Sequence, residues 1–391
     1  MSDEQQWMPP AAPGAPAPSA YGPAAPEQAP SPTAPPVGSW TAPPKPGLIP
    51  LRPLTLGNIL TGSFQVLRRN PRPTFGFALA VQLVITLVTL AVTGLVSFAA
   101  FSRLFTANAS DADEIAAGSV VAILLSTLVP GVLSMVALAL VQGILMLEIQ
   151  RATLGEKSTL RQLWARAKGR LWALIGWMLL ITLVALVAIA LLAVFIVLLT
   201  LIGPVGVALA VVVGIFGGLG FVAAAVWLGT RVSLVPSVLM GERLSLRDAV
   251  VRSWRLIDGN FWRVFGIQLL VAVIVGIAVQ VVSAPVQFLA PLVLILMDPN
   301  GTGGPVTVVV VAAIYVVSML VVLVLSSVAL VVQCAATGLI YIDLRMRKEG
   351  LDLDLARFVE ESSAGRTPAD PYLPKGGTAP GIPAQSVSPW A

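Results

Sequence analysis

Arginines and tryptophans cluster between positions 231 and 263, and this is the densest set of side chains in the chain that could bind a ligand. The cluster comprises Arg231, Arg252, Trp254, Arg255, Trp262 and Arg263. A guanidinium can hold a phosphate through two parallel hydrogen bonds, and indole rings concentrate at the boundary between lipid and water. These residue types therefore predict a collar that binds lipid headgroups or a protein partner at one membrane surface. The alternative is that they only anchor the helices and fix their orientation.

The residue types that most enzymes use are missing. The chain has no histidine and one cysteine, Cys334. This excludes Ser-His and Cys-His nucleophilic pairs, His-ligated metals, imidazole acid–base catalysis and a disulfide within the chain. We expect no catalytic residue, no metal site and no cofactor, and we interpret the protein as non-enzymatic.

Composition and charge spacing indicate a membrane protein. Of the 391 residues, 57% are hydrophobic and 11% charged, whereas a soluble domain carries about 25% charged residues. Long charge-free stretches exceed the roughly 20 residues that cross the hydrocarbon of a bilayer. The longest allows two crossings with a break at Gly203-Pro204. The sequence thus predicts an all-α integral membrane protein with six transmembrane helices, near 75–101, 118–147, 172–201, 205–230, 263–284 and 306–340.

Basic residues gather at one set of span ends, around 68–72, 151–170, 231–263 and 345–348, and Arg103 is the only one in the opposite loops. Lys and Arg near span ends mark the cytoplasmic side. We therefore expect a multi-pass protein of the cell membrane with both termini in the cytoplasm. The net charge of +5 then favours membrane lipids with anionic headgroups as partners over nucleic acid.

A similar pattern recurs three times, over about 54–157, 158–243 and 244–350. Each unit opens with a Thr or Ser followed by Leu and a helical apolar period, at Thr55, Thr159 and Ser245, and such hydroxyls are typical N-caps. We interpret each unit as a helical hairpin preceded by an amphipathic helix that lies flat at the membrane interface. Convergence is the alternative to duplication. A simple extension of the following span is the alternative to a flat helix, although Gly259-Asn260 favours a bend.

Residues 51–350 form the predicted membrane domain, and the segments on either side are rich in Pro, Ala and Gly. Residues 1–50 and most of 351–391 cannot bury enough apolar surface to offset the entropy of ordering, so we expect disordered cytoplasmic tails. Their proline-rich stretches could bind a protein partner, or they could be simple spacers.

The cluster also resembles a known family. The chain reads RVSLVPSVLMGE from Arg231, AVVRSWRL from Ala249 and GNFWR from Gly259. This is similar to the signature of the bacterial membrane domain of glycerophosphoryl diester phosphodiesterases. The Pro- and Ala-rich tails and the Ala/Val-heavy spans are similar to those of its actinobacterial members. The likeness covers roughly residues 50–350, although the specific motif is confined to 230–263. One departure is that Met240-Gly241 stands before Glu242, where the family often places an acidic residue directly after the leucine run.

The resemblance implies a six-span protein, in a family where many members lack the catalytic domain and most have no known function. The family's phosphodiesterases use paired histidines and a carboxylate cluster in a barrel of about 250 residues. This sequence has neither the histidines nor a soluble segment of that length. The resemblance therefore implies the membrane part without the enzyme.

Two classes of function stay open. The first is a membrane protein that organises the bilayer or holds lipids or partners at the inner leaflet. The second is a transporter or flippase-like pathway for a small or amphiphilic solute, which a polar cavity lined by glutamines would favour. The spans contain few charges, and their polar side chains include Gln82, Gln142, Gln268, Gln280, Gln287 and Gln333. Such glutamines either join helices by hydrogen bonds or line a path for a substrate.

Overall fold

The computed structural model describes residues 47, 49–106, 112–297, 304–366 and 368–373. Every regular element in those residues is a helix. Within the same residues, six helical stretches are long and apolar enough to cross a membrane. The predicted all-α membrane fold with six spans is therefore confirmed. Residues 1–46 of the predicted N-terminal tail lie outside the described residues.

The long helices agree closely with the predicted spans. They are α2 (Phe77–Thr106), preceded by the short π-helix η1 (Arg72–Gly76), α3 (Ala112–Ser126), α4 (Leu128–Thr153), α6 (Leu171–Thr200), α7 (Pro204–Val232), α10 (Phe261–Met297) and α11 (Pro305–Glu349). The break between α6 and α7 falls at Gly203, where a φ of 99° suits glycine. The main difference is that α10 continues through Pro285 and Pro291, past its predicted end near 284, because membrane helices tolerate proline.

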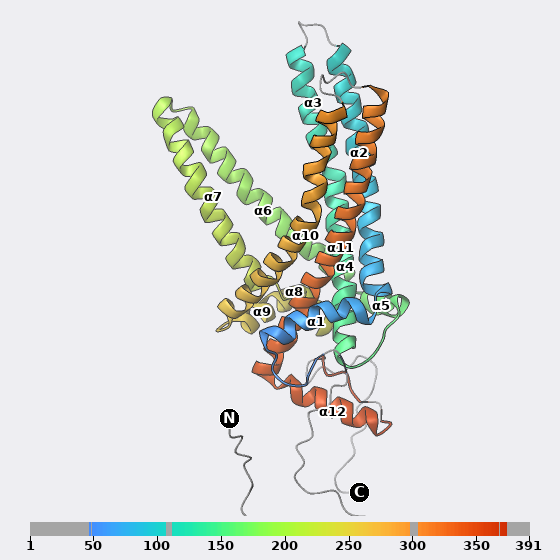
Figure 1. Ribbon diagram of the computed structural model, residues 1–391. Coiled ribbons are helices and arrows are strands. Elements are labelled where there is room, and N and C mark those ends of the chain that lie inside the picture. The colour runs from blue at the N-terminus through green and yellow to red at the C-terminus, as the bar shows by residue number, and fades with distance from the viewer. Residues whose placement is uncertain (1–46, 48, 107–111, 298–303, 367, 374–391) are drawn as a thin grey trace, which may run out of the picture. The chain divides into compact units, whose positions relative to one another are not determined.

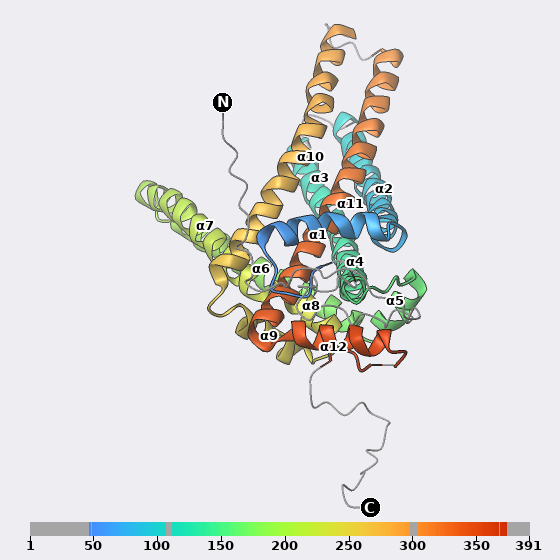
Figure 2. The same cartoon turned by 60° about the horizontal axis from the view of Figure 1, so that its bottom comes forward.

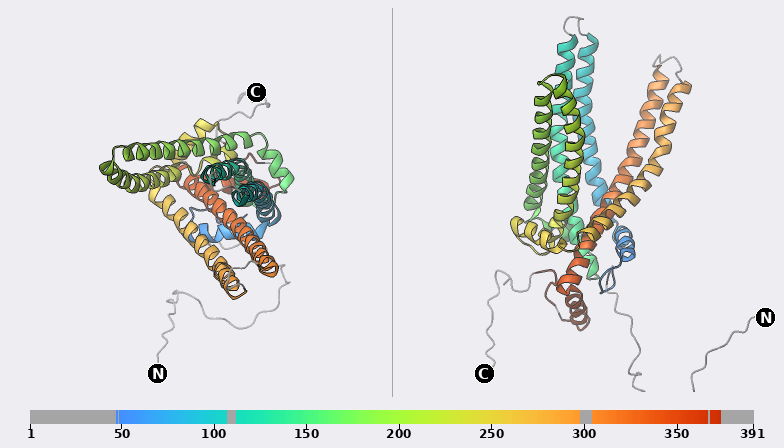
Figure 3. Two further views of the ribbon diagram at one scale, coloured as in Figure 1. Left: turned by 90° about the horizontal axis from the view of Figure 1, so that it is seen from above. Right: turned by 90° about the vertical axis from the view of Figure 1, so that its left-hand side faces the viewer.

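Five shorter helices gather at one end of the long ones, which we call the base (Figures 1 and 2). They are α1 (Leu56–Arg69), α5 (Leu160–Ala167), α8 (Val235–Gly241), α9 (Leu246–Ile257) and α12 (Leu351–Ser363). Figure 3 shows the long helices running away from the base in pairs, with α6 beside α7 and α10 beside α11. All the tertiary features described below lie at the base or just above it.

The predicted helix starts in the three units are confirmed. Thr55 and Ser245 each accept a hydrogen bond from a backbone N–H three residues later. Thr159 does the same and forms a capping box, because the Gln162 side chain accepts from the Thr159 N–H at 2.9 Å. The predicted bend after α9 is also present, at Gly259 with a φ of 75°. Local sequence signals therefore determine where α1, α5 and α9 begin and where α9 turns into α10.

The buried core is concentrated near the base. Its members come from the base ends of α4 and α11, from α8 and from the inner faces of α1, α5 and α9, and they include Ile144, Ile149, Leu239 and Tyr341. Toward the far ends of the long helices, large apolar side chains are exposed, such as Phe98 and Leu201, each at 75%. Such exposure is stable in hydrocarbon, and it is what a spanning helix presents to lipid.

The segment 351–391 is predicted to be mostly disordered, but its described residues, 351–366 and 368–373, include ordered structure, and residues 374–391 lie outside the described part of the chain. The segment opens with α12, and Tyr372 beyond this helix is 1% exposed. Asp370 pairs with Arg151, the Tyr372 hydroxyl bonds to Thr153, and the Tyr372 carbonyl accepts from Arg345 at 3.2 Å. Burial raises the pKa of the Tyr372 phenol. Residues 370–373 are thus docked on the base by polar contacts with distant residues, which hydropathy cannot reveal.

Candidate functional site

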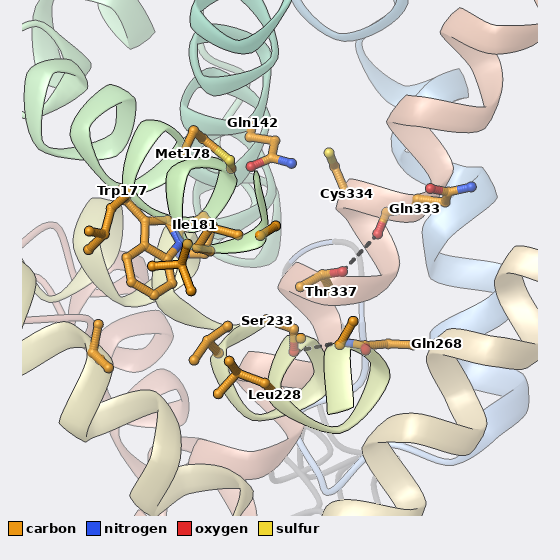
Figure 4. A pocket seen from close by; sticks show the side chains of 18 of the residues that line it. Gln142, Trp177, Met178, Ile181, Leu228, Ser233, Gln268, Gln333, Cys334 and Thr337 are labelled. Atoms are coloured by element: carbon orange, nitrogen blue, oxygen red, sulfur yellow. Dashed lines mark hydrogen bonds between the residues drawn. The ribbon is translucent and has the colours of Figure 1, made fainter. Parts of the chain in front are cut away.

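A cavity of about 850 Å³ lies just above the base, between α6 and α7 on one side and α10 and α11 on the other (Figure 4). Most of its lining is hydrocarbon from these four helices, and α4 and α9 add further side chains. The lining runs along α7 from Phe221 to Val232 and includes Trp177 of α6, Pro236 of α8 and Trp254 of α9. A largely apolar cavity with a few polar groups is the usual form of a small-molecule site.

The polar side chains around this cavity are neutral. Gln268 donates to the Ser233 hydroxyl at 2.8 Å, so that pair is satisfied. Gln142 also lines the cavity, but its buried Oε1 has no hydrogen-bond partner among the described residues. An unpaired buried carbonyl is costly, and a ligand or water that donates a hydrogen bond would relieve that cost.

Three of the six glutamines named from the sequence line the cavity: Gln142, Gln268 and Gln333. The other three, Gln82, Gln280 and Gln287, are not among the lining residues. Hydropathy alone could not separate these sets, because both occur in similar apolar surroundings. Because three glutamines stand among mostly hydrocarbon side chains, the lining is more apolar than the polar cavity that would have favoured transport.

Glycines on two helices show why the cavity lies where it does. A Cβ atom on Gly143 of α4 would come within 3.2 Å of Leu171, Leu174 and Met240, so the contact between α4 and α6 is already tight. A Cβ atom on Gly229 of α7 would meet nothing within 4 Å, and Gly229 lines the cavity. The contact of α7 with α10 and α11 is therefore left open, whereas that of α4 with α6 is filled.

Arg231 lies at the base end of α7, among aromatic rings. Its guanidinium carbon is 5.0 Å from the centroid of Trp254 and 5.7 Å from that of Phe261. Its NH1 donates to Asp258 at 3.2 Å, while its buried Nε has no acceptor among the described residues. Trp254 also lines the cavity, so one indole ring separates this cation from the apolar space.

Arg252 is committed to two carboxylates of the protein itself. Its Nε lies 2.9 Å from Glu242, whose side chain is 3% exposed, and its NH2 lies 2.6 Å from Glu349. Glu242 also accepts from the Tyr341 hydroxyl at 2.9 Å. Burial lowers the pKa of Arg252, but the Glu242 and Glu349 carboxylates together more than offset this effect, so the net shift of the pKa is upward. Arg252, on α9, therefore joins the end of α8 to α11 through two ion pairs.

Arg263 likewise bonds to groups of the protein itself, although its side chain is 36% exposed. Its NH2 donates to Asp343 at 3.1 Å and to the carbonyl of Leu54 at 2.9 Å. Asp343, with a side chain 2% exposed, also accepts from Arg347 at 2.9 Å and from the Leu54 N–H at 2.7 Å. This buried carboxylate ties α10 and α11 to the segment that leads into α1.

The remaining two members of the predicted collar are on the surface. Arg255 is exposed on α9, and Trp262 is 79% exposed at the start of α10 beside Phe261 and Phe265.

The six residues of the predicted collar therefore do not form one site. Arg231 and Trp254 touch each other, Arg252 and Arg263 serve separate buried carboxylates, and Arg255 and Trp262 face outward. The sequence did not reveal that Glu242 and Asp343 are the buried partners of these arginines. The available signal was that each carboxylate lies near the end of a repeat unit.

One hydrogen bond recurs at three places in the base. Each donor follows the first helix of a unit, which is α1, α5 or α9, and lies just before the next long helix or in its first turn. Each acceptor is the carbonyl just before the N-cap of another unit. The bonds join Asn70 to Ser158 (2.9 Å), Arg170 to Leu244 (3.0 Å) and Arg263 to Leu54 (2.9 Å). The first unit thus bonds to the second, the second to the third, and the third back to the first, which supports the interpretation of an internal repeat.

Comparison of the chain with protein-family models, with curated proteins and with solved structures finds no match. The resemblance of residues 231–263 to a membrane-domain family therefore depends on the motif itself. Within the described residues, no group of three or more Cys, Asp and Glu side chains could hold a metal ion. The features that remain for a functional argument are the cavity and the arginine beside it.

Proposed function

We propose that this chain is a non-enzymatic membrane protein that holds the hydrocarbon chain of a membrane lipid in the cavity between α6–α7 and α10–α11. The observation that carries the proposal is the cavity itself, about 850 Å³ with a mostly hydrocarbon lining, on helices apolar enough to cross a membrane. An acyl chain is the most abundant apolar occupant that a membrane supplies. The open space beside Gly229 gives it room.

The proposal includes the orientation that the charges favour. The base carries the basic segments, so we place it at the inner face of the cell membrane with both termini in the cytoplasm. In this position the exposed side chains of α9 and the start of α10 meet lipid headgroups. The proline-rich tails can then bind a cytoplasmic partner, and the family resemblance is kept as part of this proposal.

A pair of double variants tests the cavity. Four exposed small residues on α7 provide the test and its control, because Ala225 and Gly229 line the cavity whereas Gly220 and Ala223 do not. We expect Ala225→Phe/Gly229→Phe to fill the space and remove tightly bound lipid, and Gly220→Phe/Ala223→Phe to leave that lipid in place. Native mass spectrometry after gentle extraction counts the lipids on each protein. Equal lipid retention by the two folded double variants would contradict the proposal.

Transport of an amphiphile is the second candidate, and one feature favours it. The α6–α7 pair contacts the rest of the bundle near the base (Figure 1). Movement of that pair would change access to the cavity. Vesicles containing the protein and a dithionite-quenchable fluorescent lipid distinguish holding from transfer. We expect no faster loss of inner-leaflet fluorescence than in protein-free vesicles, and faster loss would favour transport.

A further inference from the structure

The cavity has a cation at its base end, and this identifies the class of lipid that would fit best. Val232 and Ser233 line the cavity, and Arg231 directly precedes them on α7. The Trp254 ring connects the two features, because it lines the cavity and lies 5.0 Å from the Arg231 guanidinium. A lipid whose chain fills the cavity would therefore have its headgroup near Arg231.

Arg231 has hydrogen-bonding capacity that the protein does not use. Its side chain is 16% exposed, and within the described residues its only hydrogen bond goes to Asp258. Asp258 is itself 72% exposed, so water weakens that pair. A guanidinium offers five N–H donors in a planar fork, and a phosphate diester can accept two of them at once.

The surroundings of Arg231 are cationic as well as aromatic. Lys348 Nζ lies at the same end of α9, where it donates to the carbonyls of Arg255 at 3.0 Å and Asp258 at 2.6 Å. The Arg255 side chain is exposed there. Arg231, Arg255 and Lys348 thus lie around the end of α9, where the Asp258 carboxylate pairs with Arg231, and this local excess of positive charge suits an anion. On the cavity side, the Ser233–Gln268 pair places polar groups where the ester region of a lipid would lie.

We propose that the cavity selects an anionic phospholipid, with the acyl chain along α7 and the phosphate on Arg231 at the edge of Trp254. This inference rests on the proposed lipid-holding function. It adds that the ligand is a phosphodiester lipid of the leaflet on the base side, and that Arg231 determines selectivity while the cavity determines retention.

The test compares headgroup selectivity with total lipid binding. The full chain is reconstituted in phosphatidylcholine nanodiscs that contain 10 mol% phosphatidylglycerol, and the lipids retained after release into detergent are identified by native mass spectrometry. We expect wild type to enrich phosphatidylglycerol about tenfold over its share, the effect of one charge-assisted contact. Arg231→Gln should lose this enrichment and still retain phosphatidylcholine. Arg231→Lys, which keeps the charge without the fork, should retain part of it.

Arg247→Gln is the matched control, because it removes a charge from an exposed position on the same helix as Trp254. We expect it to keep full enrichment, and folding of every variant is checked by gel filtration. Undiminished enrichment in folded Arg231→Gln, or equal loss in Arg247→Gln, would overturn the assignment. If Arg231→Gln does not fold, either of two other results would overturn the assignment. One is that wild type binds lipid without headgroup preference, and the other is that Arg231→Lys enriches phosphatidylglycerol as strongly as wild type does.

Two further results distinguish a lipid headgroup from free phosphate, and lipid holding from headgroup selection. Addition of 10 mM inorganic phosphate to wild type should leave the enrichment unchanged, and its loss would show a site for free phosphate instead of a lipid. If wild type retains no lipid of either kind, the lipid-holding function fails. If it retains lipid without headgroup preference, only the role of Arg231 fails.

Discussion

Two contacts between helices illustrate how one residue type produces opposite results in this protein. At Gly143 the absence of a side chain lets α4 pack directly on α6, with side chains of α6 and α8 filling the space. At Gly229 the absence of a side chain is not compensated by any neighbour, and a cavity results. The difference lies in what faces each glycine. Small residues in a membrane helix therefore indicate a possible close approach, and only the opposing helix decides whether it occurs.

The largest effect should come from breaking a buried carboxylate that closes the base. Asp343→Ala leaves Arg263, Arg347 and the Leu54 N–H without their acceptor. We expect a loss of about 2–4 kcal/mol in the free energy of unfolding, because the buried Leu54 N–H loses its acceptor and two partly exposed arginines lose a charged partner. Unfolding in mixed micelles with increasing denaturing detergent measures it. Asp258→Ala removes an exposed carboxylate and should cost less than about 1 kcal/mol; similar losses in both would contradict the distinction.

The next effect compares the two glycines directly. Gly143→Leu must displace side chains that already lie 3.2 Å from the added Cβ, so we expect a loss of about 1–3 kcal/mol by overpacking. Gly229→Leu meets open space and should change stability by less than about 0.5 kcal/mol. The same unfolding assay measures both variants. Equal destabilisation would mean that the space beside Gly229 is closed in the membrane.

A smaller effect concerns the docked segment 370–373, which covers the base end of α4. Tyr372→Phe removes the hydroxyl that bonds to Thr153, at a cost of about 1 kcal/mol near neutral pH. Burial raises the pKa of Tyr372 above its usual value of 10.0. The unfolded chain thus loses this proton before the folded protein does, and the advantage of wild type should shrink as pH rises above 10. Parallel unfolding curves of the two proteins at pH 8 and at pH 10.5 measure this; a difference that is constant with pH would contradict it.

The smallest effect should come from the helix caps, which were predicted from the sequence. Thr159→Ala removes the hydroxyl that accepts from the Gln162 N–H, while the backbone N–H of residue 159 can still donate to the Gln162 side chain. We expect a loss of about 1 kcal/mol. Thr159→Ser keeps a hydroxyl at the same position and should behave as wild type. Neither change touches the cavity, so lipid retention should be the same in both variants.

Local signals predicted the parts of the fold that depend on one stretch of chain. Charge-free length located the spans, Thr159 and its counterparts located the helix starts, and Gly203 and Gly259 located the breaks. Distant contacts could not be predicted in this way. Asp343 bonds to residues 54 and 263, and Arg252 bonds to residues 242 and 349, so arginines that resemble headgroup ligands in the sequence are used inside the protein. The cavity was beyond prediction too, because it depends on the helices opposite Gly229.

The most direct test of the central claim is photo-crosslinking with a phospholipid that carries a diazirine on its acyl chain. The lipid is mixed with the full chain in vesicles and irradiated, and the adducts are located by mass spectrometry of peptides. We predict preferential labelling of the cavity wall, on α7 between Phe221 and Val232 and on α10 around Val271, and loss of that labelling in Ala225→Phe/Gly229→Phe. Labelling spread evenly over exposed span surfaces such as Phe98, and unchanged in the double variant, would contradict a lipid site in this cavity.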